Sequence, residues 1–255
     1  FMSASSLMGF IIGLLWIPGE FNFKRKILND LSSVPINFVN ERLRYLPARI
    51  YNFTRGGQIK AVFNMGSSAL RVFLFSATFF FTGFSVFFVP LPVLLKDSLM
   101  MSNSEVYLLY ILNSAASTFF YRKAGRIMNS WGSNKTIKLS LTLRAALFPI
   151  VIFPLFMIQS DVLKISILVL IFISMGLTWS LLNVASQYLL THLAPGKVKG
   201  QVFGAYNAAI GFSGIVGALI GGFVARYFGY PSAFILATLF VLVGLFLSAK
   251  IEKEV

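Results

Sequence analysis

The sequence predicts an all-α membrane protein with about seven transmembrane helices. Of its 255 residues 57% are hydrophobic and only 12% are charged, and the mean hydropathy is +0.80. Soluble domains carry about 25% charged residues, so this chain has too little polar surface to coat a water-soluble body. Seven stretches supply the roughly 20 apolar residues that a spanning helix needs, at 2–18, 71–95, 105–121, 137–158, 163–191, 201–227 and 231–249.

The first predicted span is separated from the other six by a long polar segment. We therefore expect a helix at 1–18, a basic linker at 19–70 and a six-helix bundle at 71–255. Within the linker, apolar residues are spaced among the charges as in a helix that lies on the membrane surface. The chain starts at Phe1 and its first span has no polar anchor, which favours a fragment of a longer protein.

Several helix boundaries can be read directly. Ser102 and Glu105 have the spacing of a capping box before an apolar run. Pro231 stands where a first-turn proline is tolerated. The span at 201–227 is rich in glycine, yet in lipid it must be helical because its backbone groups have no other partners.

The positive charges alternate between loops. Lys and Arg are frequent at 19–70, 122–138, 197–199 and 250–253 and scarce in the loops between these segments. Because cytoplasmic loops collect Lys and Arg, we expect the segment 19–70 and the C-terminus to be cytoplasmic in a multi-pass protein of the plasma membrane. The same bias accounts for the net charge of +14, so nucleic acid is not an expected partner.

Polar side chains inside the spans are candidates for a substrate pathway, because buried polar groups are costly in a bilayer. Trp179, Asn183 and Gln187 share one helical face at i, i+4 and i+8. The other candidates are Asn113, Ser117 and Asn207. These groups suit hydrogen bonding to a polar solute, and the alternative is that they bond between helices.

Arg144 is the only basic residue well inside a span. One interpretation is that its side chain reaches back to the membrane interface. The other is that it anchors an anionic group of the substrate.

Glycines recur at intervals of three, four and seven residues in the span 201–227. They are Gly204, Gly211, Gly214, Gly217 and Gly221. Such a stripe predicts a face at which another helix approaches closely. It is either ordinary tight packing or a sliding contact with a second bundle.

The sequence offers little for catalysis or metal binding. It contains one histidine, no cysteine and eight acidic residues, and no acidic residue lies near the centre of the six later spans. We therefore expect no enzyme activity, no metal and no cofactor. Ion coupling usually uses a buried carboxylate, so these spans contain no evident coupling site, and secondary active and facilitated transport both stay open.

Two stretches resemble the major facilitator superfamily. In GRIMNSWGSNK, residues 125–135, the spacing of Gly125, Asn129, Gly132 and Lys135 matches the signature loop of that family, with Asn129 in place of its usual acid. The glycines permit a tight turn, and Arg126 and Lys135 are able to reach helix C-terminal carbonyls, as in a conformational latch. The second stretch, 194–234, is similar to the eleventh and twelfth helices of that family and the loop before them.

The resemblance implies the C-terminal half of a transporter: the sixth helix at 1–18, the central loop at 19–70, and helices seven to twelve after it. It also implies transport of a small solute by alternating access, with the lipid bilayer and a missing N-terminal half as partners. The alternatives are a non-transporting scaffold or sensor with the same fold, or a membrane-embedded lipid-modifying enzyme.

Overall fold

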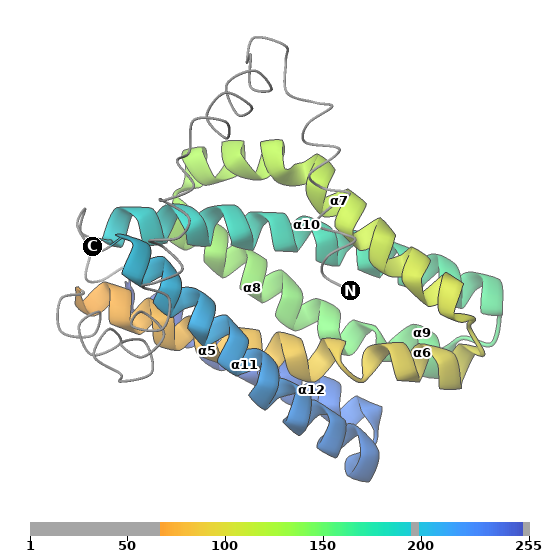
Figure 1. The fold of residues 1–255 in the computed structure, drawn as a ribbon. Helices are drawn as coiled ribbons and strands as arrows, with labels where there is room; N and C mark the ends of the chain where they lie inside the picture. Colours follow the sequence, from red (N-terminus) through yellow and green to blue (C-terminus); the bar gives the residue numbers. More distant parts are fainter. Residues whose placement is uncertain (1–66, 195–198, 252–255) are drawn as a thin grey trace, which may run out of the picture. The chain divides into compact units, whose positions relative to one another are not determined.

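The computed structural model describes residues 67–194 and 199–251, in which every regular element is a helix. The expected all-α fold is therefore confirmed (Figure 1). The helix predicted at 1–18 and residues 19–66 of the linker predicted at 19–70 lie outside the described residues, and the last residues of that linker belong to the first described helix instead. In chain order the helices are α5 (Ser68–Phe88), α6 (Leu91–Leu99), α7 (Asn103–Trp131), α8 (Ser133–Ile150), α9 (Ile152–Met157), α10 (Asp161–Leu193), α11 (Lys199–Phe228) and α12 (Tyr230–Ala249).

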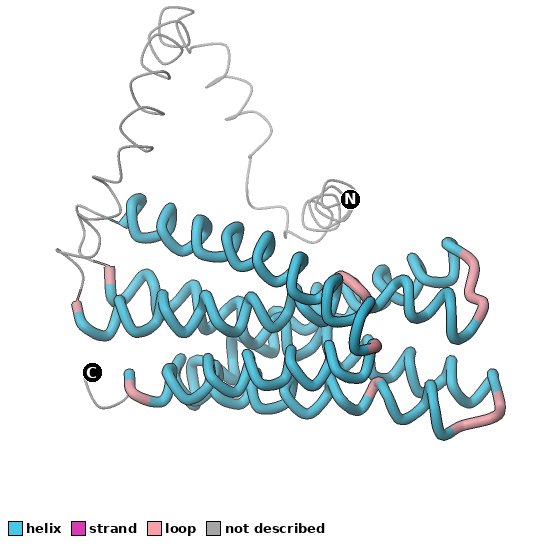
Figure 2. The backbone as a smooth tube through the Cα atoms, turned by 90° about the horizontal axis from the view of Figure 1, so that it is seen from below, coloured by secondary structure: helices cyan, strands magenta, loops and turns pink. Residues whose placement is uncertain are grey.

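The six long helices pack in two groups of three. In one group α5 packs against α11 and α12, and in the other α10 packs against α7 and α8. Contacts between α8 and α12 join the groups. The connections between helices are short and lie mostly at the two ends of the bundle (Figure 2).

Two of the predicted spans are each divided into a long and a short helix. Pro90 separates α5 from α6, and α8 ends one residue after Pro149. A proline has no backbone N–H to continue the helical ladder, so helices bend or break where one occurs. The predictions at 71–95 and 137–158 therefore have the right extent but missed these interruptions.

Five stretches of the described residues are long and apolar enough to cross a membrane: Ser68–Asp97, Ser133–Leu155, Asp161–Leu193, Lys199–Phe228 and Tyr230–Ala249. The remaining long helix, α7, contains the span predicted at 105–121. Its 29 residues extend about 43 Å at 1.5 Å per residue. However, its polar and basic side chains make it less apolar than these five stretches, so its membrane crossing stays a prediction.

The two predicted helix starts are confirmed. The Ser102 hydroxyl accepts a hydrogen bond from the backbone N–H of Glu105 at 3.3 Å, and the Glu105 carboxylate accepts one from the backbone N–H of Ser102 at 2.7 Å. Pro231 lies in the first turn of α12. These local signals do not depend on what the helix packs against, which is why the sequence alone reveals them.

The glycine stripe of α11 divides into two parts. A Cβ atom at Gly217 would lie 2.6 Å from the Thr82 carbonyl oxygen, and one at Gly221 would lie 2.7 Å from the Val86 carbonyl oxygen, so this part packs closely on α5. The other part consists of Gly204, Gly211 and Gly214, where an added Cβ atom would meet nothing within 4 Å. Within the described residues the stripe is not one continuous packed face, because it winds around the helix and only its C-terminal end meets α5. For Gly204, Gly211 and Gly214 a contact with a second bundle stays a prediction.

Three glycines outside the stripe make equally close contacts. Gly83 on α5 lies against the Ala237 carbonyl of α12, and Gly244 on α12 lies against the backbone of Ser76 and Phe80 on α5. The Ser76 hydroxyl also donates a hydrogen bond to the Gly244 carbonyl at 2.7 Å. On the other side of the bundle, Gly176 of α10 lies against the backbone carbonyl of Asn113. Single glycines in otherwise apolar helices gave no pattern from which these contacts could be predicted.

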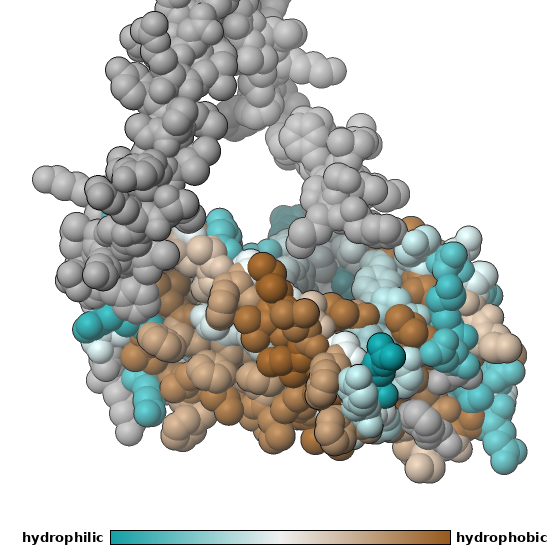
Figure 3. Space-filling view, turned by 60° about the horizontal axis from the view of Figure 1, so that its bottom comes forward, coloured by the Kyte–Doolittle hydropathy of each residue, from teal (hydrophilic) through white to brown (hydrophobic). Residues whose placement is uncertain are grey.

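Charged side chains of the described residues gather at the two ends of the bundle. Apolar side chains cover most of the middle in the view of Figure 3. The end at which α5 begins carries only basic residues: Arg71, Arg122, Lys123, Arg126, Lys135, Lys138, Lys199 and Lys250. The opposite end carries all the acidic residues of the described part, together with three basic ones: Asp97, Glu105, Asp161, Lys96, Lys164 and Arg226.

Candidate functional site

Arg144 is the one charged residue of the described part that lies deep inside the bundle. Only 2% of its surface is exposed. It occupies the buried face of α8 together with Ile137, Leu141 and Phe148. Because these apolar residues fix that face against α10 and α12, the side chain cannot reach back to the interface. The first interpretation of Arg144 is therefore wrong.

The guanidinium group of Arg144 is held by one hydrogen bond and two aromatic rings. Its Nη2 donates to the Met175 carbonyl at 3.0 Å. Its central carbon lies 4.4 Å from the centre of the Phe84 ring and 5.3 Å from that of Trp179. A cation over an aromatic face is stabilised by the ring quadrupole, more so away from water. Helices α5, α8 and α10 thus meet at this group.

Two donor atoms of Arg144 are buried without a partner, namely Nε and Nη1. The three acidic residues of the described part are all engaged elsewhere. Asp97 accepts a hydrogen bond from Tyr230 at 3.0 Å, Glu105 caps α7, and Asp161 pairs with Lys164 at 3.0 Å. A buried charge without a counter-ion costs several kcal/mol. Among the described residues Arg144 therefore has no anionic partner.

An aromatic cluster extends from Arg144 towards α11. Trp179 meets Phe81 and Phe84 edge-on, with ring centres 6.3 Å and 6.4 Å apart. Phe81 in turn meets Tyr206 of α11 at 5.9 Å. Of the candidates, Arg144 and Trp179 are brought into contact with each other although they lie on different helices. The importance of Phe84 was missed, because a phenylalanine among the eight of α5 carries no signal of its own.

Asn113 and Asn183 both bond between α7 and α10. The Asn113 amide donates to the Phe172 carbonyl at 2.9 Å, and the Asn183 amide donates to the Tyr121 hydroxyl at 2.8 Å. Ser117 bonds within α7, to the Ser114 carbonyl at 3.2 Å. The interhelical alternative thus describes what both asparagine amides do in this structure.

The remaining pathway candidates lie apart from Arg144. Gln187 is exposed on α10 and Asn207 is exposed on α11. Ser186 and Tyr206, their neighbours in sequence, are buried instead. The face that joins Trp179, Asn183 and Gln187 in the helical projection therefore runs from the aromatic cluster out to the surface.

The predicted latch is mostly helical. Gly125, Arg126 and Asn129 lie inside α7, and Lys135 lies in the first turn of α8. The turn is made by Gly132 alone, whose φ of +82° is one that glycine adopts readily. The expectation that Gly125 forms part of a tight turn is wrong, because α7 runs ten residues past the predicted end of its span.

Two grooves open on the surface, and neither is lined by a pathway candidate. The first lies between α5 and α12 and has a volume of about 570 Å³. The second lies between α7 and α10, has a volume of about 490 Å³, and includes Arg122, Lys123 and Arg126. Among the described residues, no group of three His, Asp or Glu side chains is placed to hold a metal ion. The strongest candidate site in the described part is thus Arg144 with the aromatic rings that contact it.

Comparison with known proteins agrees with this architecture. No curated protein matches the chain. The model of the Major Facilitator Superfamily matches residues 73–254, which cover every described helix from the first turns of α5 onward and more than two thirds of the chain. The chain therefore belongs to the Major Facilitator Superfamily, a family of membrane transporters.

Proposed function

We propose that this chain is part of a carrier that moves a small anionic solute across the plasma membrane by alternating access, as secondary active or facilitated transport. Family membership makes it a multi-pass membrane protein that acts on small molecules. The anionic character of the solute is supported by one observation, the buried Arg144 with two unpartnered donors.

Hydrogen bonding gives Arg144 its role in the proposal. Nε and Nη1 belong to different edges of the planar guanidinium, each of which pairs its nitrogen with Nη2, so the unpartnered N–H of either one is able to bind an oxygen of a carboxylate or phosphate. Nη2 is already occupied by the Met175 carbonyl, which fixes the orientation of the group. An incoming anion would thus find unpartnered N–H donors whose orientation is set before it binds.

In this proposal Trp179 controls the access of the solute to Arg144. Its ring lies against the guanidinium, yet the residue is only half-buried. A rotation of this side chain would uncover Arg144 to a solute coming from the side of Asn183 and Gln187. The opposing wall of the pathway would come from a second six-helix bundle, and the open glycines of α11 are suited to face it.

The test is uptake by the complete protein in proteoliposomes. Radiolabelled carboxylates and phosphate esters are each compared with an uncharged analogue of the same size. We expect uptake of an anion by the wild type and a loss of about tenfold to a hundredfold in Arg144→Gln, since hydrogen bonds to charged groups are worth about 1.5–3 kcal/mol.

Arg226→Gln is the matched control, because Arg226 is exposed at the opposite end of α11 and we expect its loss to leave uptake unchanged. Uptake of neutral analogues that is equal in the wild type and in Arg144→Gln would refute the anionic class while leaving a transporter.

A further inference from the structure

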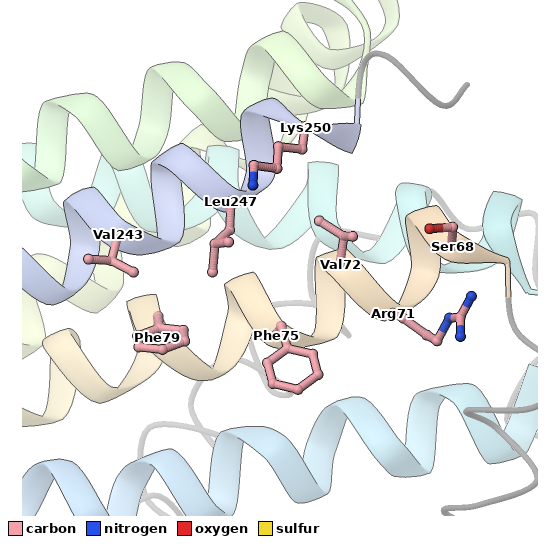
Figure 4. A pocket seen from close by; sticks show the side chains of 8 residues that line it. All are labelled: Ser68, Arg71, Val72, Phe75, Phe79, Val243, Leu247 and Lys250. Carbon is pink, nitrogen blue, oxygen red and sulfur yellow. The ribbon is translucent and has the colours of Figure 1, made fainter.

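The groove between α5 and α12 combines an apolar floor with a basic end. Val72 and Phe79 of α5 lie opposite Val243 and Leu247 of α12 across it, and Phe75 projects from the side of α5 away from α12 (Figure 4). Arg71 and Lys250 line it at the end where α5 begins and α12 stops, and Ser68 completes its lining. The lining of the groove is therefore basic at this end and apolar along the rest of its length.

The groove lies on the outer side of a tight helix contact. On the inner side, Gly244 and Ser76 bring the backbones of α12 and α5 together. On the outer side, Phe75 is 56% exposed and Val243 is 43% exposed. The close backbone approach sets the separation of the two helices, and their outward side chains form the walls of the groove.

The dimensions of the groove match one leaflet of a bilayer. From Ser68 to Phe79 the α5 helix rises about 16 Å at 1.5 Å per residue. One leaflet contributes about half of a hydrocarbon core that is about 30 Å thick. An acyl chain that starts at the level of Arg71 would therefore run the length of the groove without crossing the midplane.

The electrostatics of this end favour an anion. Arg71 and Lys250 are both exposed, and the acidic residues of the described part lie at the opposite end of the bundle. The Lys250 ammonium nitrogen lies 5.3 Å from the centre of the Phe246 ring, so this charge is held beside the last turns of α12. Basic side chains at this level attract anionic lipids.

We propose that this groove binds one anionic glycerophospholipid, with its phosphate at Arg71 and Lys250 and one acyl chain along Phe75, Phe79, Val243 and Leu247. The inference does not depend on the proposed solute. A segment of this chain outside the described residues, or a partner helix, would need its own negative charge at the same level to satisfy the two cations.

The test measures lipid retained by the complete protein purified from membranes that contain both phosphatidylglycerol and phosphatidylcholine, by native mass spectrometry. We expect one tightly held phosphatidylglycerol in the wild type. The double variant Arg71→Gln/Lys250→Gln should lose its preference for phosphatidylglycerol by about twenty-five-fold, because each basic residue near a lipid surface contributes about fivefold.

Two further variants make the outcome decisive. Lys96→Gln/Arg226→Gln removes the same charge from the opposite end and should keep the lipid. Val243→Trp fills the apolar part of the groove from an exposed position and should release the lipid with both cations intact. Equal retention of the two lipids, or equal losses in both charge variants, would overturn the proposal.

Photocrosslinking identifies the occupant in the membrane itself. A benzophenone amino acid at position 243 should crosslink to phospholipid. A crosslink to another part of this chain or to a second protein would show that the groove is a protein contact and would overturn the lipid assignment.

Discussion

At the scale of single residues, the burial of Arg144 is the feature that most needs an explanation. A cation with one hydrogen bond and two ring contacts recovers only part of the several kcal/mol that desolvation costs. Replacing such groups by apolar ones of similar volume is often neutral or stabilising. The burial of a cation at such a cost therefore favours a functional role for Arg144 over a structural one.

The substitution Arg144→Met separates these two roles. We expect the variant to unfold at the same temperature as the wild type or a few degrees higher, since about 1–4 kcal/mol is often gained when an apolar side chain replaces a buried ion. Anion uptake should be lost in the same variant. Thermal unfolding in detergent and proteoliposome uptake are measured together, and a large drop in the unfolding temperature would instead make Arg144 a structural residue.

At the scale of helices, α11 shows how one sequence pattern can serve two surfaces. Its C-terminal glycines meet the backbone of α5, whereas Gly204, Gly211 and Gly214 face open space. The helix also exposes large apolar residues such as Phe212, Leu219 and Phe223. These surfaces are free in the described bundle and fit contact with lipid or with a second bundle.

Matched valine substitutions on α11 test this division. Gly217→Val would place side-chain atoms against the Thr82 carbonyl and Ser85, and overpacking costs about 1–3 kcal/mol, so we expect a lower unfolding temperature. At Gly211 an added Cβ atom would meet nothing within 4 Å, so Gly211→Val should leave the unfolding temperature unchanged. Equal losses in the two variants would contradict the split stripe.

At the scale of the whole molecule, the asymmetry of charge bears on orientation. One end of the described bundle carries eight basic and no acidic residues, and the other carries three of each. Because positive loops stay in the cytoplasm, we infer that the end with Arg71, Gly132 and Lys250 is cytoplasmic. This places the proposed lipid in the inner leaflet, where anionic lipids are concentrated.

Cysteine accessibility tests this orientation. These 255 residues contain no cysteine, so a single substitution at exposed Ser130 or Ser160 introduces the one cysteine of this chain, and the unsubstituted protein serves as the labelling control. In intact cells, a membrane-impermeant maleimide should label Ser160→Cys, and Ser130→Cys should react only after permeabilisation. The reverse pattern would invert the topology.

The sequence by itself determined the elements of this protein. Apolar stretches of sufficient length, the capping pair Ser102 and Glu105, and Pro231 depend only on local chemistry and on the thickness of a bilayer. They predicted six helical regions in the right places, and the resemblance carried by residues 125–135 and 194–234 led to the right family. The errors at Pro90 and Gly125 concern how a helix is interrupted or extended, which neighbouring helices help to decide.

Only the tertiary structure decided what the polar and small residues do. From the sequence, Asn113 and Asn183 suited a solute as well as another helix, and Arg144 had two opposite interpretations. Their partners are Phe172, Tyr121 and Met175, 59, 62 and 31 residues away in the chain. The same holds for Gly83, Gly176 and Gly244, because a contact between helices depends on which faces meet, and periodicity within one helix does not specify its neighbour.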